Sequence, residues 1–352
     1  MAIFSIPNVK LCGISACVPS NEVSNHDYEF ISDKERESLV KNIGVEKRRV
    51  RKDATLTTSD MCFASAKKLM ETLKWDKQEI GLLIFVSQSN DYIIPNTSGI
   101  LQHRLGLPKT CMAMDVGMGC SGYVYGLATI AGLIHSGMIK KALLLVGDIS
   151  TSNVSYRDKS AYPLFGDAGT ATALEYQPGA EEIRFNMQSD GAGYDAIIIP
   201  SGGMRNPVSE KSFELRSYSE GIERSDLHVA MNGIDVFNFA LREVAPNIKA
   251  LAERYTLSIE EANFVVFHQA NKLINNTIRK ILKISPDKTP TSLAKFGNTS
   301  SASIPLTMVS EISEPLRTGK CKLILSAFGV GLSWGTVFIT TENLVIPELI
   351  EI

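Results

Sequence analysis

Apolar residues recur along the chain in two patterns, short near-continuous runs and longer stretches with helical spacing. Runs at 8–17, 80–87 and 137–147 predict buried strands, because a strand covered on both faces loses its polar positions. Thr57–Leu73 and Gly233–Arg254 carry apolar residues three and four positions apart, which predicts amphipathic helices. Strands that alternate with helices predict an α/β protein with parallel sheets covered by helices.

The second half of the chain repeats the order of the first. The matching segments are 57–73 with 233–254, 79–87 with 261–268, 95–105 with 271–282, 137–147 with 319–329, and 169–174 with 335–340. A period of half the chain is far too long for a solenoid of short repeats. We therefore expect duplicated β/α halves, residues 1–176 and 177–352, related by a pseudo-twofold axis.

The segment between the repeats, 176–230, is polar and irregular, with a charged stretch at 209–226. We expect a surface excursion at about 200–228. Because long loops in compact domains often carry function, this one either covers the mouth of a site or is an ordinary solvated loop.

Composition excludes several classes of function. The 352 residues are 44% apolar and 21% charged with a net charge of −2, which gives no signature of nucleic-acid binding. No window approaches the ~20 continuous apolar residues of a membrane span, and residues 1–10 lack the pattern of a secretory signal. Six cysteines without a CxxC pair give no metal-site pattern, and reduced thiols in the cytoplasm are expected.

The stretch 115–126 predicts a strand, a tight turn and a helix with a thiol, Cys120, at the helix entrance. Free N–H groups and the positive end of a helix stabilise a thiolate, which is the nucleophilic form. We expect Gly119 to adopt a backbone conformation closed to other residues, and Gly122 and Gly126 to allow a close approach. The alternative is a buried structural cysteine.

Two further polar residues lie at related places. Asn298 occupies the position of Cys120 in the second copy, and His268 ends the strand predicted at 261–268. Sites in open α/β sheets lie beyond the carboxyl ends of strands, so a twofold axis could bring the three residues together. Alternatively, His268 is a structural histidine and Asn298 a turn residue or helix cap.

A thiolate, an imidazole and an amide together suit acyl transfer. Cys120 would hold an acyl group as a thioester. The backbone N–H groups of Cys120 and of Val330, in the turn 328–331, could stabilise the tetrahedral oxyanion, and side-chain N–H groups of His268 and Asn298 could stabilise an enolate.

Five stretches resemble the β-ketoacyl-acyl-carrier-protein synthase III family, in the order in which that family has them. They are Asp115–Gly122, Phe165–Ala171, His268–Asn271, Phe296–Pro305 and Ala327–Gly335. The resemblance runs from about residue 8 to 340. It implies the thiolase-like fold, an αβαβα layered sandwich.

The resemblance implies a reaction in two steps. An acyl group passes from coenzyme A, or from a carrier, to Cys120. Malonyl on acyl carrier protein then loses CO2, with His268 and Asn298 at its thioester carbonyl, and its carbanion attacks the acyl-enzyme. The family implies no metal or redox cofactor, only thioester substrates, and a homodimer in which the loop at 92–95 reaches the partner's pocket. Carrier docking would involve Gln269, Asn271 and Lys272.

The chain departs from the family at several positions. Well-studied relatives hold the adenine of coenzyme A between a Trp and an Arg, and here Ser38 and Lys159 occupy those positions. Leu273 replaces the arginine that usually follows the His-Gln-Ala-Asn motif. These departures, with a longer excursion and tail, favour a specialised relative over a housekeeping primer of fatty-acid synthesis, and leave coenzyme A or a carrier protein open as acyl donor.

Three alternatives remain at this stage. The acyl group on Cys120 could pass to an amine or alcohol, the chain could be a catalytically silent thiolase-fold partner, or it could be a hydrolase. Retention of His268 and Asn298 favours carbon–carbon bond formation.

Overall fold

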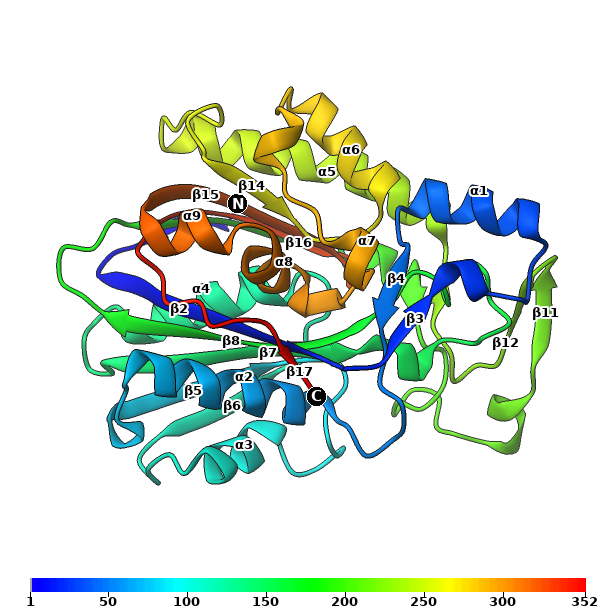
Figure 1. Ribbon diagram of the computed structural model, residues 1–352, viewed down its shortest axis with the longest axis horizontal. Helices are drawn as coiled ribbons and strands as arrows, with labels where there is room; N and C mark the ends of the chain where they lie inside the picture. The colour runs from blue at the N-terminus through cyan, green and yellow to red at the C-terminus, as the bar shows by residue number, and fades with distance from the viewer. Residues whose placement is uncertain (1) are drawn as a thin grey trace.

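The computed structural model describes residues 2–352, which form five layers (Figure 1). Two sheets enclose a central helical layer, and further helices cover their outer faces. This arrangement confirms the predicted α/β class and the αβαβα sandwich.

The first sheet has six strands, and its last strand in spatial order is β6. That order is β17 (Ile350–Glu351), β2 (Val9–Val18), β8 (Asp167–Tyr176), β7 (Lys141–Ile149), β5 (Ile80–Val86) and β6 (Met112–Val116). The second sheet has five strands, in the order β1 (Ala2–Ile6), β9 (Ile183–Ser189), β16 (Ser333–Glu342), β15 (Lys320–Gly329) and β14 (Phe264–Phe267).

The two sheets repeat the same strand order, β2-β8-β7-β5 in one and β9-β16-β15-β14 in the other. The expectation of purely parallel sheets is wrong, because β7 pairs antiparallel with β8 and β15 antiparallel with β16. Only residues 330–332 join β15 to β16, whereas a parallel connection needs a crossover of a dozen residues or more.

The expectation of irregular structure throughout 176–230 is also wrong, because β9 lies inside the second sheet between β1 and β16. Ile183, Phe185 and Met187 alternate along it and are buried. The intervening polar residues hid this alternation in the sequence. Asn186 is nevertheless fully buried, and its side-chain N–H donates to the carbonyl of Asn247 at 2.8 Å.

The sheets exchange their terminal strands. β1 pairs antiparallel with β9 in the second sheet, although it begins the first half. β17 pairs with β2 in the first sheet, although it ends the second half. Each half therefore holds one strand of the other's sheet.

Helices fill the remaining three layers. The central layer contains α4 (Gly122–Ile134) and α8 (Ser303–Glu311), and the outer layers contain α2 (Thr58–Leu73) with α3 (Thr97–Leu105) and α5 (Gly233–Arg254) with α6 (Lys272–Ile281) (Figure 1). The close approach predicted for Gly122 and Gly126 is confirmed. A Cβ at either position would lie 2.8 Å from a side-chain carbon, of Val86 or of Leu144.

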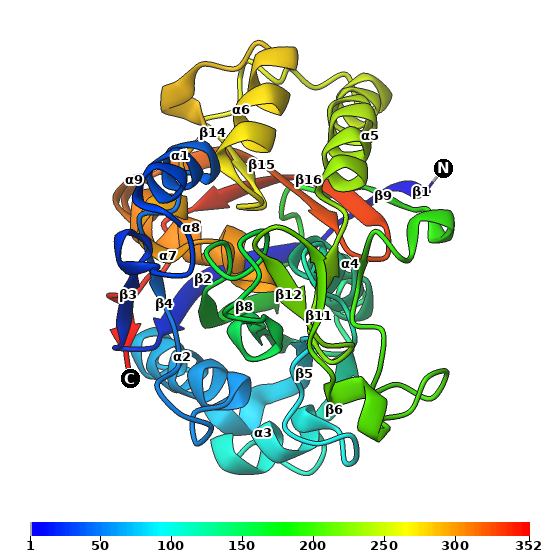
Figure 2. The ribbon, with the colours of Figure 1, turned by 90° about the vertical axis from the view of Figure 1, so that its right-hand side faces the viewer.

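One end of the molecule gathers the elements outside the layers (Figure 2). They are α1 (Asp33–Ile43), the pair β3 (Glu22–Ser24) and β4 (Lys47–Arg49), and the hairpin β11 (Arg216–Ser219) and β12 (Ile222–Arg224). Smaller elements are β10 (Ile197–Ile198) paired with β13 (Ala230–Met231), α7 (Leu293–Phe296) and α9 (Ser313–Thr318). Within residues 2–352, no helix combines the length and apolar character needed to cross a bilayer.

Candidate active site

Cys120, His268 and Asn298 line one cavity of about 450 Å³. Cys120 lies in the turn between β6 and α4, His268 follows β14, and Asn298 precedes α8. The structure therefore brings the three predicted residues together from both halves of the chain.

Cys120 differs from the other cysteines in exposure. Its side chain is partly accessible, whereas the five others are buried. Gly329, at the end of β15, lies directly against it, and a Cβ at position 329 would be 2.9 Å from the sulfur. A partly exposed cysteine that lines a cavity argues against the alternative of a buried structural cysteine.

Gly119 has a different role from the one expected. Its backbone is outside the left-handed region that favours glycine, so the prediction of a special backbone conformation is wrong. Space is the actual constraint. A Cβ at this position would collide with the side-chain oxygen of Gln88 and lie 2.7 Å from a methyl carbon of Val330.

Burial and, to a smaller extent, the charge of Asp148 raise the pKa of the Cys120 thiol to about 11. Hydrogen bonds from the backbone N–H groups of Val330 and Cys120 and from the Ser300 hydroxyl oppose this shift. Loss of solvation outweighs those donors, so the pKa of the thiol lies above its ordinary value despite the stabilisation expected at the helix entrance. Even so, the two N–H groups that converge on the sulfur are the pair predicted for an oxyanion hole.

His268 is 1% exposed, and burial lowers its pKa to about 3, so the ring is neutral at physiological pH. Its Nδ1 lies 2.7 Å from the Ser303 hydroxyl oxygen, which also accepts the Gln269 N–H at 3.4 Å. A Ser303 O–H that donates to Nδ1 places the ring proton on Nε2. A neutral imidazole with an Nε2–H can donate a hydrogen bond to a carbonyl oxygen.

Asn298 is held by its backbone and by its side-chain oxygen. Its N–H donates to the Leu164 carbonyl at 2.9 Å, and its carbonyl accepts the Gly166 N–H at 3.0 Å. Its Oδ1 accepts the Ser300 N–H at 2.9 Å. These bonds leave the side-chain N–H groups free to donate to a bound molecule.

Asp148, at the end of β7, lines the same cavity and was missed in the sequence. It is 3% exposed, and burial raises its pKa. Its Oδ1 accepts the Gln88 N–H at 2.8 Å, and its Oδ2 accepts the Ser301 hydroxyl at 2.6 Å. A carboxylate within the apolar run 141–149, at a strand's carboxyl end, was the available signal.

The three predicted docking residues differ in accessibility. Gln269 is 1% exposed. Its side-chain N–H donates to the Phe267 carbonyl, and its side-chain oxygen accepts the Thr291 hydroxyl and the Ser292 N–H. Its assignment to docking is therefore wrong. Asn271 caps α6, accepting the Ile274 N–H at 2.8 Å, and faces the cavity. Lys272 is exposed beside Gly44.

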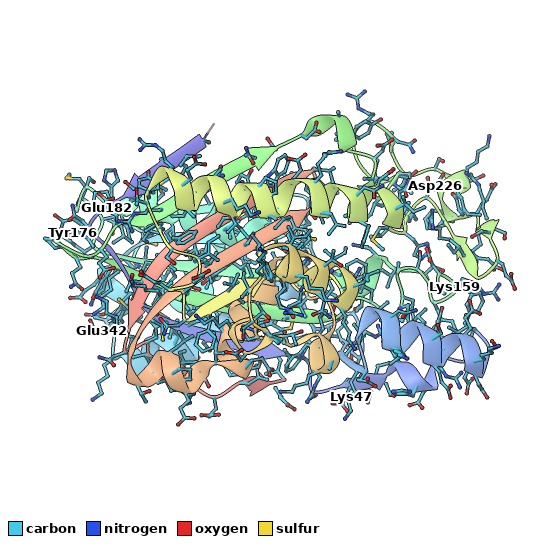
Figure 3. The ribbon with its side chains drawn as sticks, turned by 90° about the horizontal axis from the view of Figure 1, so that it is seen from above. Lys47, Lys159, Tyr176, Glu182, Asp226 and Glu342 are labelled. Atoms are coloured by element: carbon cyan, nitrogen blue, oxygen red, sulfur yellow. The ribbon has the colours of Figure 1, made fainter. Side chains whose placement is uncertain are left out.

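Ser38 and Lys159 lie outside the cavity. Ser38 is an exposed residue of α1. Lys159 is at the end of the molecule where α1 and the excursion meet, and its Nζ pairs with Glu35 at 2.6 Å (Figure 3). The turn at Gly221 packs against it, since a Cβ there would lie 2.6 Å from the Lys159 side chain. The charge of Lys159 is thus paired with Glu35, and one face of its side chain packs against the turn at Gly221.

Among residues 2–352, no three His, Cys, Asp or Glu side chains are grouped so that they could hold a metal ion. The cavity's chemistry is therefore described through its thiol, imidazole, amide and backbone donors.

Comparison with protein families gives two matches in chain order. Residues 114–191 match 3-oxoacyl-[acyl-carrier-protein] synthase III, and residues 252–341 match the C-terminal model of the same family. Together they cover the segments that carry Cys120, His268, Asn298 and Val330.

Individual relatives match along almost the whole chain. The chain is 31% identical to beta-ketoacyl-[acyl-carrier-protein] synthase III 1 of Bacteroides thetaiotaomicron, covering 94% of this chain and 96% of that protein. A relative from Rhodopirellula baltica, beta-ketoacyl-[acyl-carrier-protein] synthase III, is 30% identical with coverage of 94% and 98%. The crystal structure of a 3-oxoacyl-(acyl-carrier protein) synthase from Burkholderia xenovorans superposes with a TM-score of 0.93, at 33% identity over 99% of both chains.

The electrostatic effect of Asp148 on Cys120 gives a first prediction. We expect Asp148→Asn to lower the pKa of the thiol, because a negative charge near the sulfur is removed. Iodoacetamide alkylation of Cys120 at pH 7–9, followed by intact mass, should become several-fold faster.

Asp167→Asn is the matched control. Asp167 is also buried with its pKa raised by burial, but it is bound to Thr151 and to the Arg51 N–H away from the thiol. An alkylation rate that stayed the same or fell in Asp148→Asn would contradict the assigned effect.

Proposed function

This chain belongs to the 3-oxoacyl-[acyl-carrier-protein] synthase III family, and we propose that Cys120, His268 and Asn298 carry out its chemistry. It is an acyltransferase that joins an acyl group to a malonyl unit on acyl carrier protein by decarboxylative condensation. The observation that carries the residue assignment is the single cavity lined by all three side chains.

In the first step, the sulfur of Cys120 attacks the thioester carbonyl of the acyl donor. The carbonyl oxygen becomes an oxyanion held by the N–H groups of Cys120 and Val330, which already point at the sulfur. The donor's carbon–sulfur bond breaks, and the proton of Cys120 leaves with the departing thiolate. An acyl thioester on Cys120 and a free thiol result, in accordance with covalent catalysis.

In the second step, the malonyl thioester carbonyl accepts hydrogen bonds from the Nε2–H of His268 and the side-chain N–H of Asn298. These donors stabilise the enolate that forms when the carbon–carboxylate bond breaks and CO2 leaves. The enolate carbon attacks the acyl carbon, and the carbon–sulfur bond to Cys120 breaks. The products are the 3-oxoacyl carrier protein, CO2 and the Cys120 thiolate, which takes one proton from solvent to return to the resting thiol.

The pKa of His268 favours this acceptor over an amine or alcohol. An amine or alcohol acceptor must lose a proton to a general base, and a base works best with a pKa near the operating pH. With a pKa of about 3, His268 accepts a proton poorly but remains a good neutral donor. Loss of CO2 produces the carbon nucleophile without any base.

The substrates of this family are acyl thioesters of coenzyme A and malonyl-acyl carrier protein, and we assign both to this chain. Coenzyme A and the carrier act as substrate handles, with no resident cofactor. For carrier docking we retain Asn271, which lines the cavity, and Lys272, the exposed residue that follows it at the start of α6.

We further infer a homodimer. Strand β6 is the last strand of its sheet and pairs only with β5, so one row of its backbone groups is unpaired. Beside it, Tyr92, Ile93 and Ile94 are 62%, 96% and 83% exposed. A second copy related by a twofold axis would pair with this edge and cover these side chains.

The repeated strand orders support residues 1–176 and 177–352 as the two duplicated units. In this proposal β1 and β17 are terminal extensions, each of which adds a strand to the sheet of the other unit.

The nucleophile assignment predicts a mass difference. The unmodified protein should gain the mass of the acyl group on incubation with an acyl thioester, and Cys120→Ser should gain none, because its hydroxyl is a far weaker nucleophile. Cys321→Ser, which removes a buried thiol elsewhere, should acylate normally. An acylated Cys120→Ser protein would exclude Cys120.

The enolate assignment predicts a separation of the two steps. His268→Ala and Asn298→Ala should still acylate Cys120, while CO2 release from malonyl carrier protein falls about 10²–10³-fold, the typical loss for one oxyanion donor. The control is His103→Ala, an exposed histidine of α3. Normal CO2 release in both cavity variants would overturn their assigned role.

The dimer prediction is tested by sedimentation. The protein should sediment at about twice its chain mass of 38.5 kDa, and the double variant Ile93→Asp and Ile94→Asp at the chain mass, because buried unpaired charges oppose association. Met204→Asp, at a 95% exposed residue of the excursion, should leave the dimer intact. A monomeric unmodified protein would refute the homodimer.

A further inference from the structure

One wall of the cavity is polar where it continues beyond the sulfur. Gln88 and Ser89 lie in the loop that follows β5, and Ser150 and Asn153 are the first and last residues of the short turn that follows β7. The facing wall is apolar and is formed by Ile197–Ile199 and by Val229 with Met231. The two walls therefore offer different chemistry to a group bound between them.

Three of the polar side chains on this wall have no partner among residues 2–352. Gln88 uses only its backbone N–H, which donates to Asp148, and Asn153 uses only its backbone carbonyl, which accepts the Val229 N–H. The hydroxyl of Ser150 is likewise unbonded, whereas that of Ser89 binds Thr58 and the Ile149 N–H. Gln88 is exposed and Ser150 and Asn153 are partly exposed, so these two amides and one hydroxyl present solvated donors and acceptors to the cavity.

The polar wall begins next to the nucleophile. The side-chain oxygen of Gln88 lies so close to Gly119 that a Cβ there would collide with it. Gly119 immediately precedes Cys120 in the chain. The Gln88 amide therefore lies against the turn that carries the nucleophile and lines the same cavity.

The polar wall leads away from α6. A second hollow of about 530 Å³ shares Gln88, Ser89, Ile149 and Asn153 with the cavity and extends to Tyr92 and Ile93. Asn271 and Ile274 of α6 bound the other end, where we have placed carrier docking. With the donor's handle at α6, the acyl chain runs along the polar wall.

We propose that the acyl group loaded on Cys120 carries a neutral hydrogen-bonding substituent, a hydroxyl, carbonyl or amide, which Gln88, Ser150 and Asn153 recognise. This inference rests on the proposed function of Cys120. An alkyl chain would displace water from these side chains without replacing its hydrogen bonds. Sites built to bind a substrate hydroxyl or amide reject the analogue that lacks it much more strongly than apolar pockets distinguish chain lengths.

The neutral character of the substituent follows from the charges at the far end of the wall. Arg51 and Asp91 both line the second hollow, one cation and one anion. Their opposite charges favour neither a carboxylate nor an ammonium group on the acyl chain.

The test compares acyl donors of equal length with a minimal handle. N-acetylcysteamine thioesters of hexanoic acid, of hexanoic acids hydroxylated at each carbon beyond the β-carbon, and of glutaric acid are incubated with the full-length protein. Acylation of Cys120 is followed by intact mass. We expect at least one hydroxyhexanoyl donor to react at least tenfold faster than hexanoyl and glutaryl.

Variants assign the preference to the wall. Gln88→Leu and Asn153→Leu should each reduce the ratio of the hydroxyhexanoyl to the hexanoyl acylation rate at least tenfold. Asn96→Leu, the same change at an exposed residue outside both hollows, should keep the original preference.

The outcomes separate the inference from the proposed function. Faster acylation by hexanoyl or glutaryl than by every hydroxylated donor overturns the polar acyl group and leaves Cys120 as nucleophile. A hydroxyl preference unchanged in both leucine variants overturns the assignment to this wall. No acylation by any donor overturns the proposed function and this inference with it.

Discussion

The contact of Gly329 with the sulfur of Cys120 is the constraint on which the site depends. The two residues lie in different halves, and any side chain at position 329 would occupy the place of the sulfur. Because this glycine has a φ of 155°, a conformation that other residues rarely adopt, the turn can pass over the thiol and direct the Val330 N–H at it. The catalytic geometry is thus set by the packing between the halves.

Burial is the second constraint, and it favours the uncharged form of Cys120, His268 and Asp148 alike. The thiol of Cys120 stays protonated, the ring of His268 stays neutral, and the pKa of Asp148 rises, because each charged form loses solvation. A site without permanent cations stabilises negative charge only at the positions to which its N–H groups point. That suits a reaction in which an oxyanion and an enolate appear transiently.

The duplicated apolar runs were sufficient to predict two equivalent β/α halves and to place the three central residues at strand ends, and the family resemblance supplied the five-layer arrangement. The sequence was insufficient where tertiary contacts outweigh local pattern. Strand β9 was hidden because Asn186 is buried through a bond to Asn247, 61 positions away. Gln269 looked accessible because its partners, at 291 and 292, are distant in sequence. The partners of Asp148 come from two separate loops, and no local spacing reveals them.

The duplication also explains how two halves with the same strand order contribute different chemical groups to one site. Gly147 of β7 and Gly329 of β15 match in the repeat, so the residues that follow, Asp148 and Val330, are equivalent. Val330, in the second half, donates its N–H to Cys120 of the first. Asp148, in the first half, accepts the hydroxyl of Ser301, which lies three residues after Asn298 of the second.

In each half, the residue that follows the matching strand glycine therefore holds a loop of the other half. The loop held by Val330 carries Cys120, and the loop held by Asp148 carries Asn298. The nucleophile's loop is held by a neutral N–H donor, which can also serve an oxyanion. The loop of Asn298 is held by a carboxylate, which binds hydroxyl and N–H groups but would repel an oxyanion. In the proposed mechanism, this division places acyl transfer at Cys120 and leaves enolate stabilisation to the side chains of His268 and Asn298.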